Sequence, residues 1–372
     1  MNTTGKFDVV VIGGGLAGLS FAILMAQQQR KVLLLEKKSF PYHKVCGEYI
    51  SNESYPFLIR IGIPLESMKL PAIKKVRLTD HRGNQVEEEL TLGGFGISRY
   101  LLDQTLANRA KEVGVHILEN TPCTHYTKEN HGFDVYTSKG VYTSEILVAS
   151  FGRYSMGNFS KASKQGVNWV GVKYHIQYEH VSDEIALHTF SNGYCGISKI
   201  ENGQSCLCYI VKASLLKKYK NSLSALEENE LALNPFLKDI FNKAVFLYDK
   251  PCTISNITFE PKKPVLDGVF YLGDSAGTIA PLTGNGMSNA MRSAYLLHGI
   301  LESYFRNEIS IKEVERNYAK QWYKAFSIRI FKGIWMQQLF CTPVLTSLFI
   351  RIMRFAPWVK KSIIRQTHGK TF

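Results

Sequence analysis

The sequence lacks the features of a secreted protein and of a disordered one. Its seven cysteines are odd in number, scattered and without a CxxC pair, which does not fit a disulfide framework and favours a reducing compartment. No export signal is indicated, because the apolar run Val9–Ile12 stops at three glycines and only Lys6 precedes it. With 372 residues, of which 45% are hydrophobic, the chain is predicted to be cytoplasmic and to form one large or two ordinary globular domains.

Acidic residues are absent from the last 57 positions. The whole chain carries 45 Lys and Arg against 31 Asp and Glu, a formal net charge of +14. Eleven of the basic residues follow Glu315 and no acidic residue does. The first 315 residues hold the other 34 basic residues and all 31 acidic ones, so their net charge is only +3. The excess charge therefore belongs to the C-terminal region.

A long apolar run is absent as well. Residues 333–350 form an uncharged stretch of 18, whereas a membrane-spanning helix needs about 20 predominantly apolar residues. Because this stretch contains Gln337, Gln338 and Pro343, a spanning helix is not predicted. We expect instead two shorter helices from Ile311 onward, separated just before Pro343.

A glycine-rich turn near the N-terminus carries the first motif. The β-branched run Asp8–Ile12 is typical of a strand, and the apolar stretch Leu19–Ala26 has helical spacing. Between them Gly13, Gly15 and Gly18 have the GxGxxG spacing of a dinucleotide-binding unit. In that unit the first glycine allows the tight turn, the second lets the backbone approach a pyrophosphate, and the third lets helix and strand pack closely.

An acidic residue ends the second strand of this unit. The apolar run Lys31–Glu36 supplies a parallel neighbour, and Glu36 lies 18 residues beyond Gly18. A carboxylate at that place accepts hydrogen bonds from the adenosine ribose hydroxyls and disfavours the 2′-phosphate of NADP. The first motif alone leaves FAD and NAD open.

A second glycine-rich segment points to FAD. Residues 268–277 are interpreted as a strand ending in Asp274, and Ser288 to about Tyr304 as a helix. At this point the sequence resembles the FAD-dependent oxidoreductases of the geranylgeranyl reductase and aromatic hydroxylase superfamily, whose second flavin motif reads Gly-Asp-Ala-Ala-Gly, then Pro, then Gly-x-Gly-Met or Gly-x-Gly-Ile. The cofactor-binding residues that this resemblance implies are Gly273, Asp274, Pro281, Gly284, Gly286 and Met287.

The second motif departs from the family pattern at Ser275 and Asn285, but it keeps the groups that the chemistry requires. Asp274 is expected to accept hydrogen bonds from ribitol hydroxyls. The positive end of the helix that follows is expected to face the flavin, where it stabilises the negative charge of the reduced state. The site is therefore predicted to be redox-active.

Two weaker blocks lie between these motifs. Residues 96–106 resemble the family's Arg-x-x-x-Asp-x-x-Leu helix, which implies that Arg99 lies near the flavin phosphate and ribitol chain. The alternative is a surface arginine at the start of a helix, and Asp103 is interpreted as structural. Phe151 stands where hydroxylases of this group carry the Asp of an Asp-Gly pair, which favours the reductase branch.

Two residues are candidates for the reaction itself. The segment Lys44–Glu48 resembles the Cys-Gly element of geranylgeranyl reductases, in which this loop runs beside the flavin ring. The resemblance gives Cys46 a role in orienting substrate or protonating a carbanion, and a buried small hydrophobe is the alternative. Residues 193–197 resemble a Gly-Tyr-x-Gly-Trp segment, with Ile197 for Trp, so Tyr194 is expected on the pocket wall unless it is an ordinary sheet residue. Glu48 is interpreted as a loop residue.

Strand-like runs between residues 167 and 257 predict an antiparallel sheet, and residues 73–98 are interpreted as a hairpin that turns at Asp80–Asn84. The predicted class is α/β, with a Rossmann-like, glutathione-reductase-like FAD-binding domain, an inserted antiparallel β-sheet substrate domain and a basic helical C-terminal region. Their predicted boundaries are 1–72, 99–165 and 258–310 for the first, 73–98 and 166–257 for the second, and 311–372 for the third.

The basic C-terminal region allows two roles. Trp322, Trp335 and Trp358 lie among Lys and Arg, a composition typical of helices on an anionic membrane surface, so residues 316–372 are a candidate for peripheral membrane contact. The same helices would serve equally as a cap over the substrate domain with a solvated basic face. A nucleic-acid partner is not predicted, because no recognition motif accompanies the charge.

Together the motifs predict an FAD-dependent oxidoreductase that acts on a hydrophobic small molecule. The leading hypothesis is reduction of a carbon–carbon double bond in an isoprenoid or lipid-like substrate, with NAD(P)H or a protein as electron donor. The alternatives are a single-component FAD monooxygenase that hydroxylates a lipophilic phenol or polyketide, and a non-catalytic lipid-binding relative. No metal is predicted, because His43, His175 and His188 lack ligand spacing. The oligomeric state is not defined by the sequence.

Overall fold

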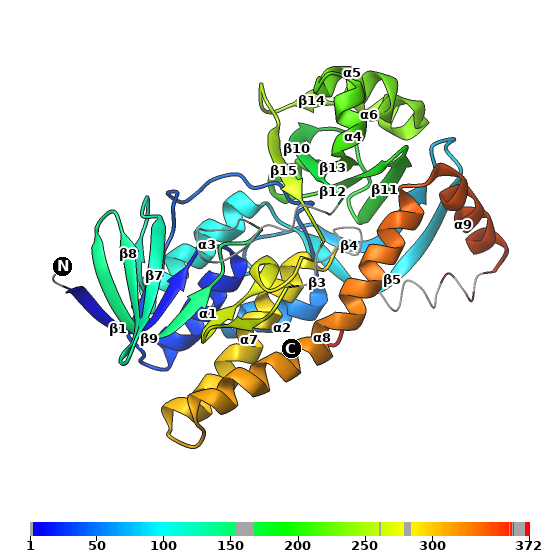
Figure 1. The fold of residues 1–372 in the computed structure, drawn as a ribbon. Helices are drawn as coiled ribbons and strands as arrows, with labels where there is room; N and C mark the ends of the chain where they lie inside the picture. The colour runs from blue at the N-terminus through cyan, green and yellow to red at the C-terminus, as the bar shows by residue number, and fades with distance from the viewer. Residues whose placement is uncertain are drawn as a thin grey trace.

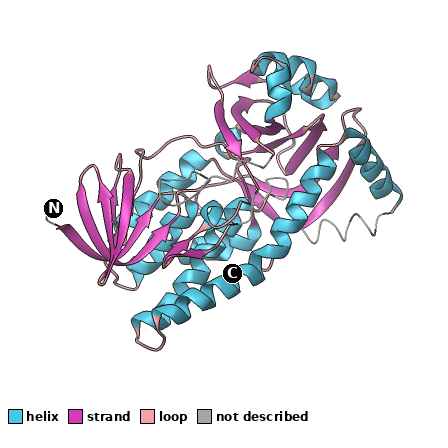
Figure 2. Ribbon diagram, in the orientation of Figure 1, coloured by secondary structure: helices cyan, strands magenta, loops and turns pink. Residues whose placement is uncertain are grey.

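Two sheets, with helices between and around them, form the chain (Figures 1 and 2). The structure is a computed structural model that describes residues 3–153, 167–259, 262–278, 284–356, 358, 360 and 369–372. Pro281 of the second motif lies outside the described residues, as do Lys361 and Arg365 of the basic region.

The first sheet has eight strands, in the order β16-β17-β9-β1-β2-β6, with β8 paired to β9 and β7 to β8. From β17 to β6 the neighbours are parallel, and β1 pairs Val9 with Val32. Its β-branched residues are buried on both faces, as a parallel sheet requires. The strands are β1 (Thr3–Ile12), β2 (Val32–Leu35), β6 (His116–Leu118), β7 (Cys123–Glu129), β8 (Gly132–Thr137), β9 (Gly140–Ala149), β16 (Val265–Leu266) and β17 (Val269–Tyr271).

Helices α1 (Leu16–Gln27), α2 (Tyr55–Arg60), α3 (Arg99–Glu112) and α7 (Gly286–Phe305) belong to the part of the chain that holds the first sheet. Helix α1 packs against both α3 and α7. The predicted strand, turn, helix and second strand of the first motif are confirmed, and α7 begins two residues before the predicted Ser288. Short 3₁₀ turns cover Asn52–Ser54, Glu201–Gly203, Leu231–Leu233 and Gly273–Ser275.

The second sheet has nine strands, in the order β14-β10-β13-β12-β11-β4-β5-β3, with β15 on β10. Its pairings are antiparallel except for β4 with β11, and the predicted hairpin with its turn at Asp80–Asn84 is confirmed. The strands are β3 (Tyr49–Ser51), β4 (Ala72–Thr79), β5 (Gln85–Gly96), β10 (Trp169–Gln177), β11 (Glu184–Phe190), β12 (Gly193–Lys199), β13 (Ser205–Lys212), β14 (Val245–Phe246) and β15 (Cys252–Ile257).

The predicted strand-like runs up to Val211 are strands, and the chain then forms three helices over 213–243 that the sequence did not predict. Helices α4 (Ala213–Lys218), α5 (Leu223–Asn229) and α6 (Pro235–Lys243) lie there and bury leucines against one face of the second sheet. Two of them have ordinary start signals. Ser222 caps α5 by accepting from Ala225 N, and Asn234 caps α6 ahead of Pro235.

The C-terminal region forms two helices, α8 (Ile311–Phe340) and α9 (Pro343–Phe355), as the break before Pro343 predicts. Helix α8 extends from the end beside α7 to the second sheet, and α9 packs on β5 and β11 (Figure 1). Phe340, Ile350 and Met353 are buried there. The inner face of this region is therefore a cap on the second sheet. Within the described residues no single helix meets the length and hydropathy of a membrane span. Helices α8 and α9 meet it only as a pair bent by 105°.

Candidate active site

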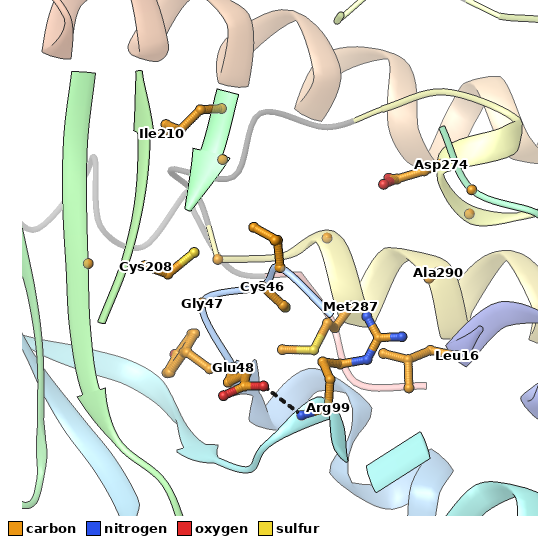
Figure 3. Close-up of a pocket in the computed structure, with 18 of the residues that line it drawn as sticks. Leu16, Cys46, Gly47, Glu48, Arg99, Cys208, Ile210, Asp274, Met287 and Ala290 are labelled. Atoms are coloured by element: carbon orange, nitrogen blue, oxygen red, sulfur yellow. Dashed lines mark hydrogen bonds between the residues drawn. The ribbon is translucent and has the colours of Figure 1, made fainter. Parts of the chain in front are cut away.

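A cleft between the two sheets brings most of the predicted site residues together (Figure 3). Its unfilled volume, open solvent included, is about 1390 Å³. The predicted residues that line the cleft are Gly15, Cys46, Arg99, Tyr194, Gly273, Asp274, Gly284, Gly286 and Met287. The other predicted residues of the first motif, Gly13, Gly18 and Glu36, do not line the cleft.

The three glycines of the first motif differ in what surrounds them. A Cβ on Gly13, whose φ is +105°, would lie 2.6 Å from the Ser150 carbonyl oxygen, and one on Gly18 would lie 2.1 Å from the Gly13 oxygen. Gly15 is extended, with φ −85°, and its Cβ would meet only the Ser150 oxygen, at 4.0 Å. The protein's own packing thus requires glycine at 13 and 18. At Gly15 the space is open toward the cleft, as a ligand pressed against the backbone requires.

The start of α1 offers donors to that ligand. Gly15 is its N-cap, and no described side chain caps the helix, so its first backbone N–H groups are free to bind an anion. A pyrophosphate fits this place. Glu36 is buried beside the same turn, where its carboxylate accepts hydrogen bonds from Gly14 N at 2.8 Å and Lys38 N at 3.0 Å. Its contact with a ribose stays a prediction.

Arg99 lies at the start of α3, in the cleft rather than on the surface (Figure 3). Its guanidinium pairs with Asp103, at 2.8 Å from Nε to Oδ1 and 2.9 Å from Nη2 to Oδ2. Lys44 Nζ lies 2.6 Å from the same carboxylate. Burial opposes ionisation of Asp103, but Arg99 and Lys44 outweigh it and hold its pKa below the ordinary value. The arginine is therefore fixed in a place where it can face a cofactor.

The second motif differs from its prediction at one point. Strand β17 ends at Tyr271, not at Asp274, because the chain turns at Gly273 with φ +57°. Asp274 lines the cleft, and its Oδ2 accepts a hydrogen bond from Arg153 Nε at 2.9 Å. Arg153 was not predicted as a site residue. It follows Gly152 after β9 and gains significance only from this long-range pairing.

The start of α7 is the second helix terminus at the cleft. No described side chain caps it, and a Cβ on Gly286 would meet no atom within 4 Å. Met287 lines the cleft beside it. Open glycines at the starts of α1 and α7, with Asp274 and Arg99 between them, fit an extended cofactor that has a phosphate chain and a redox ring.

The loop before β3 supplies the groups nearest the chemistry. Cys46 and Glu48 both line the cleft, and Cys208 faces them from the second sheet (Figure 3). Burial raises the pKa of the Cys46 thiol, against the opposing charge of Arg99, so the thiol holds its proton at neutral pH. Tyr194 is buried on β12, and its hydroxyl has no hydrogen-bond partner among the described residues.

Glu48 lies in the loop before β3, as predicted, but its burial and its ion pairs were not predicted from the sequence. The residue is fully buried at φ +56°, and its carboxylate contacts Lys173 Nζ at 2.7 Å and His175 Nε2 at 2.5 Å. Burial opposes its charge, but the hydrogen bond from His175 and the charge of Lys173 lower its pKa. A signal was present, since Lys173 and His175 are polar residues at alternate positions of the apolar run Val170–Ile176.

Comparison with known proteins accounts for these features. The family described as FAD binding domain matches residues 8–43. Over 86% of its length the chain is 24% identical to the digeranylgeranylglycerophospholipid reductase of Methanocaldococcus jannaschii, of which it covers 83%. The chain thus carries an FAD-binding motif and is similar over most of its length to members of the FAD-dependent oxidoreductase and monooxygenase superfamily. It is therefore an enzyme of the FAD-dependent oxidoreductase type.

Two other known proteins are also similar. The conditioned medium factor receptor 1 of Dictyostelium discoideum is 25% identical over 86% of this chain and 68% of its own. The structure of the flavin-dependent brominase Bmp2 superposes with a TM-score of 0.77 at 18% identity, covering 99% of this chain and 94% of that one. These likenesses support the Rossmann-like fold of this oxidoreductase and leave its reaction open.

Proposed function

We propose that this FAD-dependent oxidoreductase reduces a carbon–carbon double bond in an isoprenoid or lipid-like substrate. The observation that carries the proposal is the half-buried, protonated Cys46 thiol in a cleft whose second-sheet wall is apolar. Ile185, Leu187, Ile197 and Ile210 line that wall. The similarity to a digeranylgeranylglycerophospholipid reductase over 86% of the chain supports it further.

The reduction adds two electrons and two protons across the double bond. FAD held at Gly15, Arg99 and Gly286 would supply one carbon with a hydride, which is both electrons and one of the protons, and NAD(P)H or a protein would be the source of the electrons. The other carbon takes a proton, and Cys46 is the group placed to give it. A thiol with a raised pKa is a suitable acid, because it keeps its proton until a carbanion develops. The apolar wall excludes water and orients the chain of the substrate.

Replacement of Cys46 by alanine tests this assignment. In anaerobic assays with a digeranylgeranyl ether lipid and reduced enzyme, the rate of saturated product formation is expected to fall by about 10²-fold or more. Bound FAD and its reduction by the donor are expected to be unchanged, as measured by flavin absorbance. Cys123→Ala, in the core of the first sheet, is the control. An unchanged rate in the Cys46 variant would remove the thiol from the mechanism.

A monooxygenase is the second candidate, favoured by the fold similarity to PqsL, a probable FAD-dependent monooxygenase of Pseudomonas aeruginosa. The two reactions are separated by labelled dioxygen during turnover. A saturated product without label supports reduction, whereas stoichiometric incorporation of label into a hydroxylated product contradicts it.

A further inference from the structure

A chain of side chains connects Glu48 in the cleft to the surface. His175 bonds Glu48 through Nε2, and its Nδ1 lies 2.5 Å from the Tyr248 hydroxyl. That hydroxyl lies 3.2 Å from His43 Nδ1. His43 is half-buried, and its ring stacks at 4.7 Å on the exposed Tyr100. The chain thus begins at a fully buried carboxylate and ends at an imidazole that water reaches.

The partners define a single direction for the hydrogens. His175 Nε2 donates to the Glu48 carboxylate, so His175 Nδ1 accepts from Tyr248. The Tyr248 oxygen is then left to accept from His43 Nδ1. Each member can therefore pass one proton inward and receive one from its outer neighbour, which is the requirement for a relay.

A purely structural role would not need this arrangement. The fully buried Lys173 already neutralises the charge of Glu48, so Tyr248 and His43 are not needed for that purpose. Glu48 also takes a left-handed backbone conformation, which is strained for a residue other than glycine. A metal site is disfavoured. Although Glu48, His175 and Cys206 place ligand atoms within 4.8 Å of one another, the Lys173 ammonium already occupies the carboxylate.

We propose that Glu48, His175, Tyr248 and His43 form a proton relay that restores the proton given up by Cys46. This inference rests on the proposed reduction. Cys46 lies two residues before Glu48, and the Glu48 backbone hydrogen-bonds the Cys46 thiol. In each cycle Cys46 loses one proton to the substrate carbon, and His43 takes one from water. The relay carries one proton to the Glu48 carboxylate, and the Cys46 thiolate takes that proton from Glu48, so that both groups return to their starting states. The other titratable groups that face the relay are Lys173, Cys206, Cys252, Glu201 and Tyr100.

Tyr248→Phe breaks the relay while keeping the ring. The first proton is already on Cys46, so the single-turnover rate of double-bond reduction is expected to stay unchanged. Multiple-turnover kcat is expected to fall by about 10²-fold with a larger solvent deuterium isotope effect. Tyr178→Phe, which removes a hydroxyl bonded to Asp239 at 2.7 Å, is the control. Equal losses in single and multiple turnover, or no loss in either, would overturn the relay.

A readout without substrate separates this inference from the proposed function. In ¹⁵N-histidine NMR spectra of the FAD-loaded protein, protonation of His43 is expected to shift the His175 signals in the natural sequence and not in Tyr248→Phe. Coupled shifts with no double-bond reduction would retain the relay and reject the reaction. Independent titration of the two histidines in the natural sequence would reject the relay.

A second inference comes from the opposite face of α8 and α9. The inner faces of these helices are buried, but large apolar side chains stand exposed on the outer faces, with Phe331 at 73% and Phe355 at 81%. Their positions repeat at helical spacing, so each helix presents a continuous apolar stripe. The stripe residues are Ile328, Phe331 and Trp335 on α8, and Val344, Leu348, Ile352 and Phe355 on α9.

Basic residues flank both stripes. Lys324 precedes the stripe of α8 by one turn, and Arg351 lies within the stripe of α9, both exposed. No acidic residue follows Glu315. An apolar stripe with positive charge beside it complements a bilayer that has anionic headgroups, where each nearby Lys or Arg contributes about 1 kcal/mol. We infer that the outer face of α8 and α9 docks on an anionic membrane.

The test replaces Phe331, Trp335 and Phe355 together by serine. Deletion of residues 316–372 is a poorer test, because α8 also buries Tyr318 and Trp322 in the core. The full-length protein is expected to sediment with vesicles of phosphatidylcholine and phosphatidylserine. The triple variant is expected to bind them at least tenfold more weakly, because serine has no apolar surface to bury in the bilayer.

The control replaces three apolar residues that are exposed elsewhere, Val181, Leu233 and Val245, by serine, and it is expected to bind like the natural sequence. Equal vesicle binding by both triple variants would overturn the inference. It would also be overturned if analytical ultracentrifugation showed a dimer that only the first variant loses and no vesicle binding occurred, because the stripe would then be a contact between copies.

Discussion

Replacing Gly15 by alanine is expected to weaken FAD binding by about 100-fold while the fold is retained. The backbone at Gly15 is extended, and a Cβ there meets only one protein atom at 4.0 Å. The alanine variant is expected to lose no more than about 1 kcal/mol in its free energy of unfolding, which is the scale of a changed N-cap residue. The methyl group would instead occupy the space where a pyrophosphate approaches the start of α1. Flavin titration of the FAD-stripped variant measures the loss of affinity, and urea unfolding measures its stability.

Gly13→Ala is the matched comparison. Its φ is +105° and its Cβ would lie 2.6 Å from the Ser150 oxygen, so this variant is expected to lose stability and flavin together. Comparing the two variants distinguishes Gly15, where glycine is needed for FAD binding, from Gly13, where glycine is needed for the fold. FAD affinity unchanged in Gly15→Ala would show that the phosphates do not lie at the start of α1.

Asp103→Asn is expected to lower the free energy of unfolding by about 3–5 kcal/mol, the scale for breaking a buried ion pair. Asp103 is fully buried, and the change leaves the cations of Arg99 and Lys44 facing each other without a counter-charge. Urea unfolding at neutral pH measures the difference. Glu112→Gln, which breaks the exposed pair with Arg109, is the control and is expected to cost less than about 1 kcal/mol.

The pH dependence of that difference follows from the pKa of Asp103. Its pKa is lowered in the folded protein, so its contribution is present above the ordinary value of 3.8 and is lost as the pH falls through the folded pKa. The natural sequence and Asp103→Asn are therefore expected to converge in stability on acidification. A gap that persists undiminished in acid would show that the loss arises from packing and not from charge.

Local patterns and long-range contacts were not equally predictable. The first motif could be predicted from the sequence because each of its glycines acts on neighbours a few residues away. The break before Pro343 could be predicted because proline disrupts the helix in which it stands. The pair of Arg153 with Asp274 spans 121 residues, and that of Glu48 with Lys173 spans 125. No local rule joins such partners. The fold brings them together by pairing strands that are distant in sequence.

Helices α4 to α6 show an intermediate case. Their signals were present at Ser222 and at Asn234-Pro235, but the apolar residues around them were interpreted as part of a sheet. Tyr194 shows the converse. Its position on an alternating strand was equally consistent with a pocket-wall residue and with an ordinary core residue. Only the place of the second sheet over the cleft distinguishes these two interpretations.

The short strand β3 has a consequence for how such a protein changes over evolutionary time. It follows directly after the loop that holds Cys46 and Glu48, yet it pairs with β5 of the second sheet. The loop is thus covalently continuous with the half of the chain that holds the second sheet, although it contacts α3 through Lys44. A second-sheet half exchanged by recombination would remove the partners of this loop. New specificities in this lineage are expected to arise by point substitution along β10 to β13, with the two halves inherited as a unit.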